Sequence, residues 1–546
     1  MLKYSVLLFC LFLMFSCGWE KGKNNSKTVF KYNESAGITS LDPAFAKDQA
    51  TIWAANQLFN GLVQLDDNLN VKPCIAKSWK ISEDGLYYTF ILRNDVYFHN
   101  HPLFINNKGR NVVASDFVYS FSRLIDPKIA SPGAWVFNNV NDKITEKSFN
   151  FKALNDTTLI ICLKKPFPPF LSLLTMPYCS VVPKEIVEYY GKDFRRNPVG
   201  TGPFQFKLWK EDVKLVLVKN PDYFEKDGDQ QLPFLNAIAI TFIADKQSAF
   251  LEFVKGNLDF ISGIDPSYKD ELLTKKGELN PKFKGKFKMQ SMPYLNTEYL
   301  GFLVDEKKNN ESNNILKFKK IRQAINYGFD RKKMIKYLRN NIGTPGIFGF
   351  IPKGLPSFDS TIIIGYDYNP DKARKLLSEA GYPNGVGLPE ITLSTTSAYL
   401  DLCKFIQHQL EEINIKIRID VNPPATLREM VAQSKISFFR GSWIADYPDA
   451  ENFLSLFESD NFTPKGPNYT HFSNKAFDEL FEKAKSVTCD SLRYIFYQQM
   501  DKIIMDESPV VVLYYDQVLR FYQNNIKGLN NNPMNLLTLK KVKKVI

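Results

Sequence analysis

The sequence predicts a mixed α/β protein with more than one domain. Helical and strand patterns alternate along the chain, and this alternation is typical of layered α/β structure. The 546 residues exceed what one hydrophobic core usually supports, so two or three domains are expected. An apolar fraction of 44% and a charged fraction of 23% are those of an ordinary globular protein.

The clearest helix is predicted over 369–380. Asn369 is a favourable N-cap, Pro370 fits the first helical position, and Asp371 places an acid in the first turn. The apolar residues of one face are Ala373, Leu376, Leu377 and Ala380. Gly381 ends the helix, because glycine adopts the left-handed conformation at low cost.

Four further elements follow from apolar spacing. A helix over 402–414 ends at Asn414, which tolerates a left-handed backbone, and the alternating residues of 415–421 predict a strand directly after it. Another helix is predicted near 317–330, and the apolar run 215–218 predicts a buried strand. None of these elements carries residues that suggest catalysis, so we interpret them as structural.

The N-terminus has the pattern of a secretory signal that ends at a lipid-modified cysteine. A charged start precedes the apolar run Val6–Phe15, which is too short to span a bilayer, and Ser16 and Cys17 follow it. Residues 1–16 are therefore predicted to be a signal peptide, Cys17 the lipidation site and 17–28 a polar tether. Two acyl chains are enough for stable anchoring. A plain signal peptide with a chance cysteine is the alternative.

The folded part is accordingly expected outside the cytoplasm, on the periplasmic or cell-surface side, tied to a membrane by its lipid. No later run of about eighteen apolar residues occurs, so we do not expect it to cross the membrane. The net charge of +12 comes from scattered Lys and Arg, and only 540–544 is densely basic. This pattern favours a solvated surface, and no nucleic-acid partner is expected.

Cysteine and histidine usage indicates neither a disulfide framework nor a metal site. Of the seven Cys, those after the signal lie at wide, irregular intervals without a C-x-x-C motif. We expect buried free thiols, with one disulfide as the alternative. His99 and His101 have no Cys or acidic partner at ligand spacing, and we expect this pair to be exposed on a turn. No metal and no cofactor are predicted.

The motifs of common enzymes are missing or incomplete. No G-x-S-x-G motif for a serine hydrolase occurs, and Gly200-Thr-Gly202 lacks the Lys-Ser/Thr of a phosphate-binding loop. Asp446 and Asp449 could form the carboxylate pair of a secreted glycoside hydrolase, which is a remote alternative. Otherwise the chain is not expected to be an enzyme.

The segment 438–449 joins charged and aromatic residues to small ones. Its notable members are Arg440, Gly441, Ser442, Trp443, Ala445 and Asp446. If 438–445 is extended with a free edge, its N–H and C=O groups can pair with a ligand backbone, which small residues allow to come close. Arg440 and Asp446 lie six residues apart, so they would share one face at a spacing of roughly 20 Å.

This spacing fits an extended peptide of about two to five residues. Asp446 would accept the ammonium group of the peptide, and Arg440 would bind its carboxylate through two N–H donors. The alternative is a surface strand with an incidental ion pair.

A series of different short motifs occurs along nearly the whole chain in a distinctive order and spacing. They are Leu41-Asp-Pro43, Leu58 to Leu62, Pro73 to Trp79, Ser82 to Arg93, Ser115 to Arg123, Gly200 to Phe204, Asn220 to Tyr223, Gly256 to Asp259, Ile321 to Arg331 and Tyr368 to Tyr382. With these motifs the chain resembles the extracytoplasmic solute-binding proteins of peptide-type ABC importers, known as bacterial solute-binding protein family 5.

The resemblance implies the type II periplasmic-binding-protein fold, with two lobes joined by a hinge and three domains. Domain I would be assembled from 29–62, 189–287 and 508–546. Domain II, an extra inserted domain, would span 63–188, and domain III would span 288–507.

The resemblance also implies a monomeric, non-enzymatic receptor that captures short peptides and delivers them to the permease subunits of an ABC transporter. Asp446 stands where peptide-binding members hold the ammonium group, and Arg440 where some members meet the ligand carboxylate. Trp443 would wall a side-chain pocket, and the strand from Gly441 to Ala445 would pair with the ligand backbone.

Two features leave alternatives open. Some members of the family bind metal chelates, haem or oligosaccharides, so a non-peptide solute is the main alternative. The usual Phe-His-Asp-Gly turn is replaced here by Phe98-His-Asn-His101 and a longer insertion, so the geometry of 99–114 is not predicted.

Overall fold

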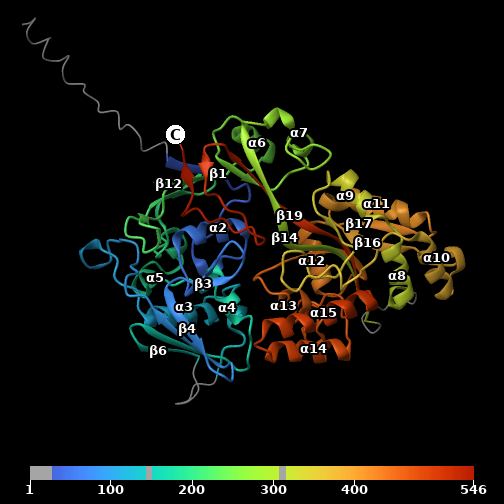
Figure 1. Cartoon of the computed structure of the whole chain (residues 1–546), viewed down its shortest axis with the longest axis horizontal. Helices are drawn as coiled ribbons and strands as arrows, with labels where there is room; N and C mark the ends of the chain where they lie inside the picture. Colours follow the sequence, from blue (N-terminus) through green and yellow to red (C-terminus); the bar gives the residue numbers. More distant parts are fainter. Residues whose placement is uncertain (1–27, 143–149, 306–314, 546) are drawn as a thin grey trace, which may run out of the picture.

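Two lobes meet along two long strands. The computed structural model describes residues 28–142, 150–305 and 315–545, so Cys17 and most of the predicted tether lie outside the described residues. In these ranges β14 (Phe287–Phe302) and β19 (Val510–Gln523) run antiparallel between the lobes (Figure 1). Elements before β14 and after β19 form the first lobe, and those in between form the second. The predicted mixed α/β, two-lobed fold is confirmed.

One sheet passes through both lobes. Its order is β17-β16-β18-β14-β19-β13-β1-β12-β9-β8, and β15 also pairs with β19. Its shorter strands are β1 (Val29–Asn33), β8 (Phe204–Lys210), β9 (Lys214–Lys219), β12 (Ala237–Thr241), β13 (Phe260–Ser262), β15 (Thr344–Pro345), β16 (Ile391–Thr395), β17 (Ile417–Val421) and β18 (Phe438–Ile444). The β14–β19 register is irregular between Pro293 and Thr297, which is where the chain crosses between the lobes.

The first lobe adds a four-stranded antiparallel sheet of order β4-β5-β7-β6. Its helices are α2 (Gln49–Leu58), α3 (Ala114–Ile125), α4 (Phe170–Leu173), α5 (Lys184–Tyr190), α6 (Lys246–Val254) and α7 (Lys269–Leu272). Its remaining strands are β2 (Val63–Leu65), β3 (Val71–Pro73), β4 (Ala76–Ile81), β5 (Tyr87–Leu92), β6 (Phe151–Asn155), β7 (Thr158–Cys162), β10 (Lys226–Asp227), β11 (Gln230–Gln231), β20 (Ile526–Lys527) and β21 (Lys543–Lys544). The antiparallel sheet falls inside the predicted domain II, whose boundaries stay a prediction.

The second lobe is mainly helical outside the shared sheet (Figure 1). Its helices are α8 (Lys319–Tyr327), α9 (Arg331–Leu338), α10 (Pro370–Glu379), α11 (Leu400–Glu411), α12 (Pro424–Ala432), α13 (Glu451–Leu454), α14 (Lys475–Ser486) and α15 (Asp490–Glu507). The predicted cap of α10 is confirmed, because the Asn369 side chain accepts the N–H of Lys372 at 2.9 Å. The helix predicted near 317–330 is confirmed as α8, which ends at Tyr327, and Asp330 caps the next helix, α9, by accepting the N–H of Lys333.

Two expectations about single side chains need correction. His99 is buried, not exposed: its Nδ1 accepts the N–H of Gly200, its Nε2 lies 3.0 Å from the Gly202 carbonyl, and burial lowers its pKa to about 4. The Cys residues described are free thiols as expected, and four of them are buried, but Cys489 is exposed.

The basic C-terminal segment is neutralised by acids of the first lobe. Lys540 pairs with Glu225, Lys541 with Asp227 and Lys544 with Asp259. These lysines therefore stabilise the fold and do not form a free basic patch. In the described part of the chain, no helix is long and apolar enough to cross a membrane.

Candidate ligand-binding cleft

Strand β18 has one paired edge and one largely open edge. Along its full length it pairs with β14, from Asn296 opposite Ile444 to Phe302 opposite Phe438. Its other edge meets β16 only at Phe439, which lies opposite Ser394. From there to the end of β18, no strand of the described chain covers that edge. The N–H and C=O groups on this side are therefore placed to receive an added strand.

The pleat of β18 divides the predicted site residues between two faces. Arg440 and Ser442 lie on one face, whereas Gly441 and Trp443 lie on the other. Trp443 packs against the second-lobe core, and its indole N–H donates to Asn452 Oδ1 at 2.9 Å. Its indole is therefore turned away from the face that carries Arg440, and its role as a pocket wall stays a prediction.

Gly441 is small because of a packing contact inside the lobe. A Cβ atom at this position would lie 2.6 Å from Cζ of Tyr299 on the neighbouring strand. Ala445 is buried, and its N–H donates to the Leu295 carbonyl at 2.9 Å. Gly441 and Ser442 keep partial exposure, whereas Ala445 does not. Their small size is thus explained at least partly by packing and not by ligand approach alone.

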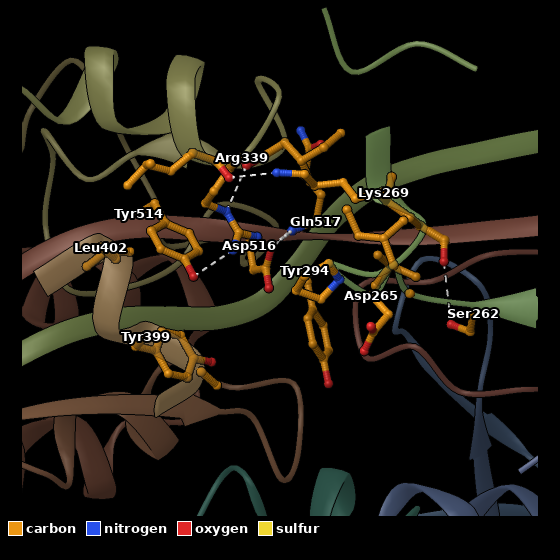
Figure 2. Close-up of a pocket in the computed structure, with 18 of the residues that line it drawn as sticks. Ser262, Asp265, Lys269, Tyr294, Arg339, Tyr399, Leu402, Tyr514, Asp516 and Gln517 are labelled. Atoms are coloured by element: carbon orange, nitrogen blue, oxygen red, sulfur yellow. Dashed lines mark hydrogen bonds and ion pairs between the residues drawn. The ribbon is translucent and has the colours of Figure 1, made fainter. Parts of the chain in front are cut away.

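Arg440 contacts Tyr399, which lines a hinge-side cavity of about 460 Å³. Its guanidinium stacks on the ring of Tyr399, a cavity-lining residue, with 3.2 Å between Cζ and the ring centroid, and it forms an ion pair with Glu298. Figure 2 shows the cavity, in which Arg339 and Asp516 pair at 2.7 Å between Tyr514 and Tyr294. Both lobes contribute to its lining, as Gln49 and Ser262 come from the first lobe and Tyr399 and Tyr514 from the second.

Asp446 lies just beyond the end of β18 and is held by Asn452. Asn452 Nδ2 lies 3.5 Å from the Asp446 carboxylate, and Asn452 Oδ1 accepts the Asp446 N–H at 3.2 Å. The Asp446 side chain is exposed, yet the protein around it removes enough water to raise its pKa, an effect that the Asn452 bond partly opposes. Because β18 ends at Ile444, strand alternation alone does not place Asp446 on the face of Arg440.

Asp446 lies close enough to the first lobe for its charge to act there. Its charge helps to raise the pKa of Tyr178 in that lobe to about 12, after the larger effect of burial. The next residue, Tyr447, packs into the first-lobe core, and its ring lies 6.3 Å from that of Trp135. Asp446 is therefore located at the boundary between the lobes, where a ligand enclosed between them would be within reach.

A second cavity between the lobes, of about 490 Å³, begins next to this segment. Pro448 and Asp449 line it from the second lobe, and Tyr88 and Phe167 line it from the first. The segment from Arg440 to Asp449 thus leads from the hinge-side cavity to this one. An extended ligand along the open edge of β18 would follow the same path.

Asp449 is not available as a catalytic partner of Asp446. Its carboxylate pairs with Arg493 at 3.2 Å and accepts the N–H of Glu451 at 2.9 Å. Both Asp449 and Arg493 are buried. Asp449 therefore has a structural role, which removes the geometric basis for a glycoside hydrolase.

Sequence reasoning missed one hydrolase-like arrangement. The Ser434 hydroxyl lies 3.0 Å from His471 Nε2, and His471 Nδ1 lies 3.2 Å from the Asp305 carboxylate. Ser434 follows the C-terminus of α12, and its N–H donates to the Val431 carbonyl, so that group does not act as an oxyanion donor. We interpret the three residues as a hydrogen-bonded link between loops.

Comparison with known proteins agrees with this architecture. Residues 70–464 match the profile of the bacterial extracellular solute-binding proteins, family 5 Middle, which is more than half of the chain. The chain belongs to this family. As a family 5 solute-binding protein it is a receptor that works outside the cytoplasm in ABC transport.

Individual family 5 proteins show what the chain is similar to. The glutathione-binding protein GsiB of Salmonella choleraesuis is 28% identical over 499 residues, which cover 90% of each chain. The periplasmic binding protein DppA of Helicobacter pylori, solved with the peptide STSA, is 26% identical with a TM-score of 0.75, covering 94% of this chain and 98% of that one. NikZ of Campylobacter jejuni, solved with Ni(L-His), is 24% identical with a TM-score of 0.72, covering 93% and 97%.

Two residues of the cleft were not found from the sequence. Glu298 carries no local signal, because only the pairing of β14 with β18 brings it to Arg440. Asn452 follows Asp446 by six residues. A polar residue at that spacing does not by itself predict a contact with Asp446, because the contact depends on the turn that brings Asn452 back to it. Both contact charged residues of the predicted site, Glu298 contacting Arg440 and Asn452 contacting Asp446.

Proposed function

We propose that this family 5 receptor captures short peptides between its lobes and delivers them to an ABC permease, while Cys17 anchors it to a membrane. Asp446 would bind the peptide ammonium group, Arg440 the far carboxylate, and the open edge of β18 the peptide backbone. The observation that carries this proposal is the Asp446 carboxylate at the interlobe boundary, next to an unpaired strand edge. Asp446 forms no ion pair with a residue of 28–142, 150–305 or 315–545, and a partly dehydrated carboxylate of this kind favours a cationic ligand group.

The similar proteins support the same ligand chemistry. Glutathione and the peptide STSA, named with two of them, each have a free amino group and a peptide backbone. Main-chain pairing would supply affinity with little dependence on sequence, because every peptide offers the same backbone groups. Lobe closure about the β14–β19 crossing would then enclose the ligand and remove its charged ends from water.

A non-peptide solute is the second candidate, favoured by the rings of Tyr294, Tyr399 and Tyr514 around the hinge-side cavity. NikZ, solved with a nickel–histidine chelate, has the same fold. Such a solute would bind mainly by stacking and coordination and not through a free peptide amine.

Titration calorimetry on the purified, ligand-free protein tests the proposal. The panel contains di- to pentapeptides, the same peptides with an acetylated amino terminus, nickel–histidine and an oligosaccharide. We expect the free peptides to bind and acetylation to weaken binding at least tenfold. Binding of the chelate or the saccharide alone, or equal binding of acetylated and free peptides, would contradict it.

A further inference from the structure

Glu298 and Arg440 form a buried charge pair on the cleft-facing side of the sheet. Only 4% of the Glu298 side chain and 11% of the Arg440 side chain are exposed. Arg440 Nη2 donates to Glu298 Oε2, and Asn296 Nδ2 donates to Oε1 at 3.1 Å. Both carboxylate oxygens of Glu298 are therefore occupied, and the positive charge of Arg440 is compensated before any ligand arrives.

The guanidinium of Arg440 is only partly satisfied by these contacts. The Tyr399 ring covers one of its faces, and its Nε–H is buried without a hydrogen-bond partner in the described chain. Buried donors without an acceptor are uncommon in folded proteins. Arg440 thus keeps one unused N–H donor, and its charge is shared with Glu298.

The guanidinium group of Arg339, which lines the cavity, is itself already paired with a carboxylate. Arg339 is paired with Asp516 at 2.7 Å and stacks on Tyr514. Together the two pairs hold two carboxylates and two guanidinium groups. A ligand carboxylate bound at Arg440 would become a third negative charge beside Glu298, and like charges this close repel each other strongly when they are shielded from water.

We propose that Glu298 is a specificity-determining residue that offsets Arg440, so that the receptor accepts ligands with an uncharged far end about as well as those with a free carboxylate. The inference rests on the proposed function, because it assumes that Asp446 orients the amino end of the ligand. The expected ligands are therefore peptides with a free amino end, and the receptor would select little between a charged and an uncharged carboxyl end.

The wild-type protein provides the first test. One tripeptide is compared by calorimetry in two forms, with a free C-terminal carboxylate and with a C-terminal amide. We expect the two dissociation constants to agree within about threefold, since Glu298 compensates the charge of Arg440. A preference of about thirtyfold or more for the free acid would overturn the inference.

The Glu298→Gln variant provides the second test. Glutamine keeps the size of the side chain and an oxygen for Arg440 but removes the competing charge. We expect the affinity for the free acid to rise at least about tenfold relative to the affinity for the amide. The matched control is Asp401→Asn, because Asp401 lines the same cavity from α11 and forms no ion pair with a described residue. This control should change the ratio of acid affinity to amide affinity less than threefold. A change as large as that caused by Glu298→Gln would count against a specific role of Glu298.

The design separates the two claims. If acetylation of the peptide amine does not weaken binding to the wild type, the proposed function itself fails. If acetylation weakens binding but Glu298→Gln leaves the acid-to-amide ratio unchanged, only the inference fails. Melting temperatures check the variants, and if Glu298→Gln does not fold, the wild-type comparison of acid and amide decides alone.

Discussion

Asn452 contacts Asp446 through both atoms of its side-chain amide. Its Nδ2 lies 3.5 Å from the Asp446 carboxylate, and its Oδ1 accepts the N–H of Asp446 and also the indole N–H of Trp443. One buried amide thus connects the end of β18 to the start of α13. This contact fixes the position of the carboxylate on which the proposed function depends.

Replacing Asp446 by Asn should weaken the binding of free-amine peptides about 30-fold, equivalent to about 2 kcal/mol. The amide keeps the shape of the side chain but loses the charge that attracts the ammonium group. Calorimetry measures the loss, and an acetylated peptide serves as the control because it has no ammonium group to lose. The melting temperature should not fall, because burial already disfavours the charged form of Asp446. Unchanged affinity would remove Asp446 from the site.

Peptide affinity should fall in mild acid. Only ionised Asp446 attracts the ammonium group, and burial raises its pKa above the usual 3.8. The peptide amine, with a pKa near 8, stays protonated over the whole range from about pH 7 to 4. Binding should therefore decline as the pH drops through the raised pKa of Asp446, earlier than for an exposed aspartate. Asp446→Asn, measured over the same range, should show no such decline.

Asn452→Leu should shift this decline to higher pH, because the Asn452 hydrogen bond lowers the pKa of Asp446 and would be lost. It should also cost about 1–3 kcal/mol of unfolding free energy, since the indole N–H of Trp443 loses its acceptor. Asn461→Leu is the matched control: Asn461 Nδ2 donates to the Ser455 carbonyl at 3.0 Å, away from Asp446. If both variants moved the decline in binding to higher pH by the same amount, this result would argue against a positioning role for Asn452.

Gly441→Ala should destabilise the protein by about 1–3 kcal/mol, because the added Cβ would meet the Tyr299 ring at 2.6 Å. The double variant with Tyr299→Leu should recover part of the loss, since the smaller side chain makes room for the methyl group. Urea denaturation measures both. If Gly441→Ala instead left stability unchanged and weakened only peptide binding, Gly441 would be serving the ligand and not the core.

The sequence predicted those elements that are determined by residues close together in the chain. The N-cap at Asn369 and the alternation that ends in β17 are set by neighbouring residues, because capping and strand pleat act over a few positions. The order of short motifs was enough to indicate the family and the two lobes, and it led to the prediction that Asp446 and Arg440 bind the ligand.

Only the tertiary structure showed what those two residues contact. Glu298 and Arg440 are 142 residues apart in the sequence, and the register of β14 against β18 is what joins them. The same register sets the Tyr299 ring against Gly441 and turns Trp443 to the core. Charge compensation and burial depend on these long-range contacts, because a carboxylate acts on a guanidinium through distance in space and not through distance along the chain.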